Sequence, residues 1–253
     1  MSAPKPVVLC ILDGWGLRAE REANAVALAD TPNFDRIMAE FPNSMLAAHG
    51  PDVGLPEGQM GNSEVGHTNI GAGRIVWMDL PKINNAIEDG SFHTNAALLR
   101  FAKALKQSGG TAHIAGLASP GGVHAHQNHF VEAAKVLREA GIPVVIHAYL
   151  DGRDVAPQSA DVQIAALETA LPEGARIGTV CGRFYAMDRD NRWERVQKAF
   201  DLMTTGAGLA ADTAIDAIQS AYGAGETDEF VSPTAIAGYA GMKDNDGLLF
   251  MNF

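Results

Sequence analysis

Residues 143–154 read PVVIHAYLDGRD, a mostly apolar run that ends in charged residues and a glycine. Two other segments share this pattern, TAHIAGLA at 111–118 and ARIGTVCG at 175–182. Such runs are typical of strands that are buried on both faces of a parallel sheet. Apolar residues at helical spacing predict helices between and around these strands, over residues 95–107, 127–140, 159–170 and 191–203. The alternation predicts an α/β fold with a largely parallel sheet.

The N-terminal part of the chain is organised differently. VVLCIL at 7–12 predicts a buried strand that stops at a DGWG turn, and residues 44–48 predict a second, short strand. Thr31 and Pro32 predict the start of a helix that runs to about Phe41. We place a domain boundary after the glycine-rich stretch, which gives domains 1–77 and 78–253. The last residues, DGLLFMNF, have the composition of another strand.

The composition of the chain limits which partners the protein can bind and where in the cell it is expected. The 253 residues are 47% hydrophobic, which is enough for a large core. No apolar run approaches the roughly 20 residues of a membrane span, and no signal peptide is recognisable, so we expect a cytoplasmic protein. The net charge of -11 argues against nucleic acid or anionic membranes as partners. Cys10 and Cys181 lie in apolar runs, where reduced cysteines act as small buried hydrophobes.

The stretch PEGQMGNSEVGHTNIGAGR, at 56–74, raises two interpretations of Ser63. Ser63 is either a helix N-cap or a nucleophile, since a helix N-terminus suits phosphate and a base or metal would ionise the hydroxyl. Asp13 likewise is either a turn residue in LDGW or a carboxylate at a strand end that holds a divalent metal. Asp13 and Ser63 alone are too few ligands for a metal.

Ionisable side chains that follow the predicted strands form what we name the candidate anion site: His124, Arg153, Asp154, Arg183 and Arg189. The carboxyl edge of an open α/β sheet is where ligands bind. An arginine fork grips a carboxylate or phosphate, while an aspartate accepts a substrate hydroxyl. The plainer interpretation of Arg153 and Asp154 is a pair that stabilises a turn. The convergence of three strand ends favours a site for a small polyanion.

Neighbouring histidines and arginines have other interpretations. His124, His126 and His129 lie close together in sequence, but the loop spacing disfavours zinc. We expect His126 and His129 to cap a helix or lie on its surface. Arg192 and Arg195 fall in a predicted helix, where a solvated face is their expected role.

Taken together, the motifs resemble one known family. The matching segments, in chain order, are ILDGWG at 11–16, GQMGNSEVGHTNIGAGR at 58–74, GGVHAHQNH at 121–129, LDGRD at 150–154 and GRFYAMDRDNRW at 182–193. They are similar to those of cofactor-independent phosphoglycerate mutase, a member of the alkaline phosphatase superfamily. The resemblance implies a phosphatase-like domain that holds two manganese or magnesium ions, of which residues 1–77 are the N-terminal part. It implies that residues 78–253 belong to an α/β phosphoglycerate-binding domain.

The resemblance also implies roles for single residues. Ser63 matches the serine that is phosphorylated, and Asp13 and Ser63 match ligands of one metal. The residues of the candidate anion site match those that bind the substrate. The implied reaction interconverts 2- and 3-phosphoglycerate through a phosphoserine, without 2,3-bisphosphoglycerate, in a monomeric enzyme.

In one respect the sequence departs from the family pattern. Family members continue past LLFMNF into an arginine-rich motif, a lysine and the remaining aspartate and histidine metal ligands. We therefore expect the chain to be weak or inactive without a C-terminal half. Two further functions stay open: a non-catalytic phosphoglycerate-binding protein, and a related metal-dependent phosphatase or phosphopentomutase.

Overall fold

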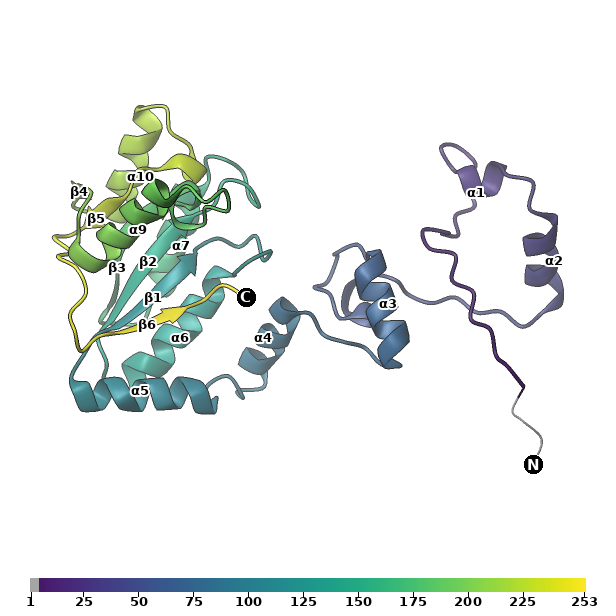
Figure 1. Cartoon of the computed structure of the whole chain (residues 1–253), viewed down its shortest axis with the longest axis horizontal. Coiled ribbons are helices and arrows are strands. Elements are labelled where there is room, and N and C mark those ends of the chain that lie inside the picture. Colours follow the sequence, from purple (N-terminus) through teal and green to yellow (C-terminus); the bar gives the residue numbers. More distant parts are fainter. Residues whose placement is uncertain (1–4) are drawn as a thin grey trace. The chain divides into compact units, whose positions relative to one another are not determined.

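The computed structural model describes residues 5–253, which divide into two compact units (Figure 1). The first unit ends at Met78, and the second spans Asp79–Phe253. No helix among the described residues is long and apolar enough to cross a membrane.

A six-stranded sheet forms the centre of the second unit, in the order β4-β5-β3-β2-β1-β6. The strands are β1 (Ala112–Leu117), β2 (Val144–Leu150), β3 (Ala175–Gly182), β4 (Leu209–Ala211), β5 (Thr234–Ile236) and β6 (Gly247–Phe250). Strands β6, β1, β2 and β3 pair in parallel, whereas β5 pairs antiparallel with β3 and parallel with β4. The prediction of an α/β fold with a largely parallel sheet is confirmed.

Helices connect these strands and cover both faces of the sheet. They are α4 (Asp79–Glu88), α5 (Ala96–Ser108), α6 (Gln127–Glu139), α7 (Ala160–Ala170), α8 (Arg183–Ala186), α9 (Trp193–Thr205) and α10 (Ala214–Gly223), with a 3₁₀ turn, η2 (Asp228–Phe230). The helices predicted over 95–107, 127–140, 159–170 and 191–203 correspond to α5, α6, α7 and α9. Strands β4 and β5 and helix α10 were not predicted.

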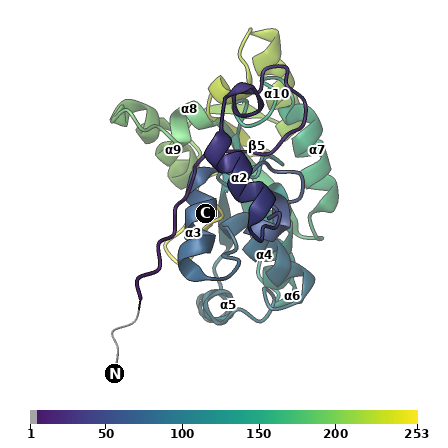
Figure 2. The ribbon, with the colours of Figure 1, turned by 90° about the vertical axis from the view of Figure 1, so that its right-hand side faces the viewer.

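Side chains of β2 alternate between the two faces of the sheet, as a strand requires. Ile146 belongs to the large core that also contains Ile164 of α7 and Ile218 of α10. Val145 belongs to a second cluster that contains Leu202 of α9. Figure 2 accordingly shows α8 and α9 to one side of β5, and α7 and α10 to the other. Full burial of each such aliphatic side chain contributes about 1.5–3 kcal/mol to the stability of the folded unit, relative to leaving it exposed.

A buried polar chain crosses three strands of the sheet. His113 Nε2 lies 3.1 Å from Asp246 Oδ2, His113 Nδ1 lies 2.8 Å from His147 Nε2, and His147 Nδ1 lies 2.9 Å from Thr179 Oγ1. Because a carboxylate only accepts, the pattern is complete when Thr179 donates to His147, His147 to His113, and His113 to Asp246. Burial, aided by His113 and Arg176, lowers the pKa of His147 to about 3. Burial also lowers the pKa of His113, against the opposing effect of Asp246. Both imidazoles are therefore neutral.

The first unit consists of short helices and loops. Its elements are α1 (Ala25–Leu28), α2 (Pro32–Glu40), a 3₁₀ turn η1 (Gly50–Val53) and α3 (Ser63–Ala72). The helix predicted from Thr31 and Pro32 is confirmed as α2, with Thr31 at the N-cap. A small cluster of Val53, Leu55 and Val65 forms the buried centre of this unit.

The strands predicted at 7–12 and 44–48 are wrong, because residues 5–78 contain no strand. Val7 is 95% exposed and Leu46 is 87% exposed. An apolar run becomes a buried strand only when neighbouring strands take up its backbone hydrogen bonds, and residues 5–78 supply none. Cys10 is exposed for the same reason, whereas Cys181 is buried as expected, and both are free thiols.

Candidate functional site

Ser63 is the first residue of α3, and Asn62 is its N-cap. The side chain of Asn62 accepts a hydrogen bond from the Val65 amide at 3.0 Å, so the cap interpretation of Ser63 is wrong. The position before this cap requires a glycine, because a Cβ on residue 61 would overlap the carbonyl oxygen of Ala48. The glycine and the asparagine form the turn and the cap, and they leave the hydroxyl of Ser63 free for other contacts.

The hydroxyl of Ser63 contacts Asp13. Ser63 Oγ donates to Asp13 Oδ2 at 2.7 Å, and His67 Nδ1 lies 3.3 Å from Ser63 Oγ and 2.8 Å from the Ser63 carbonyl oxygen. A carbonyl oxygen only accepts, so the shorter contact puts the hydrogen on His67 Nδ1. His67 therefore does not accept the hydroxyl proton. Among residues 5–253, Asp13 is the hydrogen-bond acceptor of Ser63.

Asp13 and Ser63 together offer two oxygen donors of the kind that a hard divalent cation takes. Carboxylate and hydroxyl oxygens suit Mg²⁺ or Mn²⁺, which take about six ligands. No group of three His, Cys, Asp or Glu side chains that could hold a metal occurs among residues 5–253. The donor type therefore fits such an ion, but the number of donors does not complete its coordination.

In the second unit, Arg183 lies between two carboxylates at the carboxyl edge of the sheet. It is the residue after β3, and its Nη1 donates to Asp151 Oδ1 at 2.6 Å and to Asp154 Oδ2 at 2.7 Å. Only 9% of the Arg183 side chain is exposed, and none of the Asp151 side chain. Burial alone would lower the pKa of Arg183, but the hydrogen bonds to Asp154 and Asp151 outweigh it and raise the pKa. The guanidinium is therefore charged and held in one orientation.

Asp151 receives hydrogen bonds on both oxygens. Its Oδ2 accepts from Ser119 Oγ at 2.6 Å, and its Oδ1 accepts from the amides of Arg153 and Asp154 at 3.1 and 3.0 Å, besides Arg183. Burial opposes ionisation, but the hydrogen bonds from Ser119, the two amides and Arg183 outweigh it and lower the pKa of Asp151. Asp151 is therefore an ionised, fully buried carboxylate.

Two more members of the candidate anion site lie beside this group. His124 Nε2 is 3.9 Å from Asp154 Oδ2. The side chain of Arg153 is 53% exposed, and its Nη1 is 3.7 Å from Glu229 Oε1. Arg189 is exposed, and among residues 5–253 no hydrogen bond or ion pair joins it to the other members. The structure thus brings together four of the five predicted residues.

Sequence reasoning missed Asp151 and Ser119, although both follow strands that it predicted. The signal available for Asp151 was the one used for Asp13: an aspartate directly after an apolar run and before a glycine. Nothing local to Ser119 distinguishes it from an ordinary loop serine. Its contact with Asp151 spans 32 residues, so it depends on the pairing of β1 with β2.

Several neighbouring residues differ from the sequence expectations. His126 caps α6 as expected, but His129 is buried rather than on the helix surface. Burial and the nearby His126 lower the pKa of His129 to about 4. Arg192 is the N-cap residue of α9, just outside the helix. Arg195 is not solvated on a helix face: its Nη1 donates to Asp188 at 2.9 Å and its guanidinium stacks on a phenylalanine ring.

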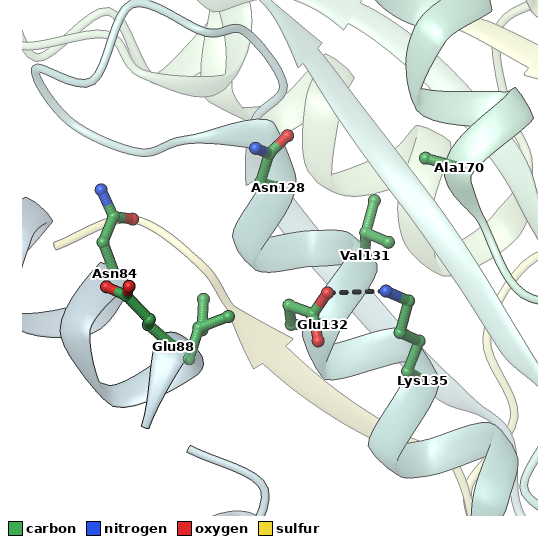
Figure 3. A pocket seen from close by; sticks show the side chains of 8 residues that line it. Asn84, Glu88, Asn128, Val131, Glu132, Lys135 and Ala170 are labelled. Atoms are coloured by element: carbon green, nitrogen blue, oxygen red, sulfur yellow. Dashed lines mark hydrogen bonds and ion pairs between the residues drawn. The ribbon is translucent and has the colours of Figure 1, made fainter. Parts of the chain in front are cut away.

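A hollow of about 410 Å³ lies elsewhere in the second unit, between α4, α6 and the end of α7 (Figure 3). Asn84 and Glu88 of α4 face Asn128 and Glu132 of α6 across it. Lys135 and Glu132, three residues apart on α6, form an ion pair of 2.7 Å along the wall of the hollow. No member of the candidate anion site lines this hollow, so we do not assign it to that site.

Comparisons with known proteins agree on one family. The family described as "BPG-independent PGAM N-terminus" matches residues 83–253. A protein of Dinoroseobacter shibae called "2,3-bisphosphoglycerate-independent phosphoglycerate mutase" is 65% identical over 253 residues, which are 100% of this chain and 50% of the relative. A protein of the same name from Paracoccus denitrificans is 60% identical over the same shares. The chain spans about half the length of the curated relatives it matches.

Solved structures give the same result. The crystal structure of Leishmania mexicana phosphoglycerate mutase at low cobalt concentration superposes with a TM-score of 0.71 at 30% identity. The match covers 96% of this chain and 47% of the other. The chain therefore belongs to the family of BPG-independent phosphoglycerate mutases, of which it represents the N-terminal portion.

Proposed function

We propose that this chain supplies the phosphoryl-carrying serine and the substrate site of a 2,3-bisphosphoglycerate-independent phosphoglycerate mutase. The observation that carries the proposal is the 2.7 Å hydrogen bond from Ser63 Oγ to Asp13 Oδ2. It gives an exposed serine at a helix N-terminus a carboxylate acceptor, as a phosphoryl-accepting hydroxyl needs. The names of the relatives support the reaction, which exchanges 2- and 3-phosphoglycerate.

Ser63 is the nucleophile in this proposal. Its Oγ forms a bond to phosphorus while the bond from phosphorus to the substrate oxygen breaks, which leaves phosphoserine and glycerate. The second displacement returns the phosphoryl group to the other glycerate hydroxyl and restores Ser63, so no 2,3-bisphosphoglycerate is needed. A Mn²⁺ or Mg²⁺ ion held in part by Asp13 and Ser63 would lower the pKa of the hydroxyl.

The second unit binds the phosphoglycerate. Arg183 is held with one edge toward its carboxylates, and Arg153 is half exposed, so each has guanidinium N–H groups that suit carboxylate or phosphate oxygens. His124 adds a further donor beside Asp154. Asp154 accepts a hydrogen bond from a glycerate hydroxyl, and Arg189 completes the charge around the anion.

In this proposal the remaining parts of the site lie in the half of the relatives that this chain does not span, since the chain covers 50% of the Dinoroseobacter shibae relative. We assign to that half the other metal ligands, including those of a second ion. We expect the complete enzyme to be monomeric and to act in the cytoplasm on glycolytic substrate. Residues 1–253 alone are expected to bind phosphoglycerate and to turn it over weakly or not at all.

A chimaera tests this proposal. Residues 1–253 are joined to the C-terminal half of the Dinoroseobacter shibae relative, which is 65% identical in the matched part. With 3-phosphoglycerate and Mn²⁺, the chimaera should form 2-phosphoglycerate, as should the complete relative as control. No product while the relative is active would contradict the proposal. Release of inorganic phosphate, or action on a pentose phosphate, would instead support the related phosphatase or phosphopentomutase.

A further inference from the structure

We propose that Asp151 is a positioning residue of the phosphoglycerate site, because it holds Arg183 and the turn at 152–154 in the arrangement that binds the substrate. The inference rests on the proposed function and goes beyond it, since Asp151 is buried and itself contacts no substrate. It assigns to Asp151 a role in affinity that is separate from its role in stability.

The first argument is the number of groups that Asp151 orients. One carboxylate accepts from the hydroxyl of Ser119, the amides of Arg153 and Asp154, and the guanidinium of Arg183. Three of these donors belong to residues of the candidate anion site. A single buried side chain thus sets the position of two backbone amides and one guanidinium at once.

The second argument is the place of Asp151 in the sheet. Asp151 directly follows β2, Arg183 directly follows β3, and Ser119 comes two residues after β1. These strands are neighbours in the sheet, so Asp151 joins the carboxyl ends of three consecutive strands. The contacts begin at the ends of hydrogen-bonded strands, which constrains the position of each group, and groups that are held in place cost less to order when an anion binds.

The third argument concerns Arg183. Its Nη1 is shared by Asp151 and Asp154, and among residues 5–253 no hydrogen bond engages its Nη2. Without the charge of Asp151, the guanidinium would have Asp154 as its one remaining carboxylate. Arg183 and Asp154 would then bind each other more closely, although both are assigned to binding the substrate. With Asp151 present, Nη1 of Arg183 donates to two carboxylates, and the edge of the guanidinium that carries Nη2 is left for an anion.

Close packing shows that the arrangement has little freedom. A Cβ on Gly121 would lie 3.3 Å from both Asp151 Oδ2 and Ser119 Oγ, and 3.0 Å from the Asp154 Cβ. A Cβ on Gly152, whose φ is +69°, would lie 2.9 Å from the Glu229 amide nitrogen. Gly121 lets its loop approach the Asp151 carboxylate, and Gly152 lets the turn after β2 pack closely against η2.

Asp246 offers a matched control at the opposite edge of the sheet. It directly precedes β6, and its carboxylate accepts from the amides of Thr111 and Lys243 and from His113. Its side chain is 8% exposed. Asp246 and Asp151 are therefore both buried carboxylates that accept from two amides and from one imidazole or guanidinium group. Asp151 also accepts from Ser119, and its donors, unlike those of Asp246, include members of the candidate anion site.

The experiment measures 3-phosphoglycerate binding to residues 1–253 by calorimetry, together with urea unfolding, for the parent, Asp151→Asn and Asp246→Asn. Both variants should lose stability, because each weakens a buried charged network. Only Asp151→Asn should lose affinity, by about tenfold or more, since hydrogen bonds to charged groups contribute about 1.5–3 kcal/mol. The Arg183 Nε–H signal in a ¹⁵N spectrum should shift in Asp151→Asn and not in Asp246→Asn.

Ser119→Ala keeps the experiment decisive if Asp151→Asn does not fold. It removes the hydrogen bond that Asp151 Oδ2 accepts from Ser119 and leaves the charge of Asp151, so we expect an intermediate loss of affinity. Parent-like affinity in a folded Asp151→Asn, or in Ser119→Ala when the first variant is unfolded, overturns the inference. So does an equal loss of affinity in Asp246→Asn. A parent that does not bind 3-phosphoglycerate instead contradicts the proposed function, and the inference fails with it.

Discussion

Ser63 Oγ donates a hydrogen bond to Asp13 Oδ2 at 2.7 Å, although 50 residues separate the two along the chain. Both residues lie in the first unit, where short helices and loops rather than a sheet hold them. The first unit therefore presents a serine whose hydroxyl is paired with a carboxylate acceptor.

Removal of the Ser63 hydroxyl should separate activity from stability. Ser63 is exposed and is not the helix cap, so Ser63→Ala should change the free energy of unfolding by less than about 0.5 kcal/mol. The same substitution should abolish phosphoryl transfer by the chimaera. Asn62→Ala is the matched control: it removes the cap and should cost about 1 kcal/mol of stability in the first unit. Mutase activity that survives Ser63→Ala would contradict the role of Ser63.

The two arginines of the site should respond differently to truncation. Arg183→Ala leaves two carboxylates, Asp151 and Asp154, without their partner, and breaking a buried pair of this kind costs about 3 kcal/mol. Arg153→Ala removes an exposed side chain whose nearest carboxylate oxygen is 3.7 Å away, so stability should hardly change. Both variants should lose 3-phosphoglycerate affinity in calorimetry. Arg153→Ala with parent-like affinity would exclude Arg153 from the substrate site.

Stability of the second unit should fall with acidification below about pH 6.5. The folded chain keeps His113 and His147 neutral, with pKa values below the ordinary one, whereas the unfolded chain takes up these protons near pH 6.5. The unfolded state then binds more protons, so each histidine lowers the free energy of unfolding by up to about 1.4 kcal/mol per pH unit. The loss continues toward the folded pKa of His147, about 3. The depressed pKa of Asp246 acts in the same direction at lower pH.

Urea midpoints measured between about pH 7 and pH 5 check this expectation. The groups that face the two rings are Asp246, Arg176 and Tyr239. His147→Gln removes one titrating group and should make the pH dependence shallower, whatever its effect on stability at neutral pH. A slope that is unchanged in this variant would show that the buried histidine does not cause the dependence.

Gly152→Ala should destabilise the second unit and weaken ligand binding. The residue has a φ of +69°, and an added Cβ would lie 2.9 Å from the Glu229 amide nitrogen and 3.0 Å from the Asp228 Cβ. We expect a loss of about 1–3 kcal/mol in urea unfolding. Gly141→Ala is the control, since its φ is also positive but a Cβ there would have no packing neighbour within 4 Å among residues 5–253. Equal losses would mean that backbone strain alone, and not the close approach, explains the effect.

The sequence predicts the sheet of the second unit well because the information is local. Continuous apolar runs such as 143–150 identify buried strands, and they coincide with the observed strands to within a residue or so. Strands β4 and β5, with three residues each, are too short to show a pattern. The run at 7–12 has the same composition as the true strands, yet it is exposed, because burial depends on partners that composition does not reveal.

The site was predictable where chemistry follows directly from a motif. Ser63, Arg183 and Asp154 are conspicuous polar residues next to glycines or strand ends, and the resemblance to a family implies a role for each, which stays a prediction. The contact of Ser119 with Asp151 was not predictable, because it joins loops after two different strands and requires their register. The N-cap at Asn62 was missed by one residue, since asparagine and serine are about equally good caps.

The most direct test of the central claim is the detection of phosphate on Ser63. The chimaera is mixed with 3-phosphoglycerate, quenched in acid during turnover, digested and analysed by tandem mass spectrometry, with Ser63→Ala in parallel. We expect phosphoserine at position 63 in the active protein, and no modified peptide and no turnover in the variant. Turnover of 3-phosphoglycerate without phosphate at Ser63, or by Ser63→Ala, would contradict the claim that this serine carries the phosphoryl group.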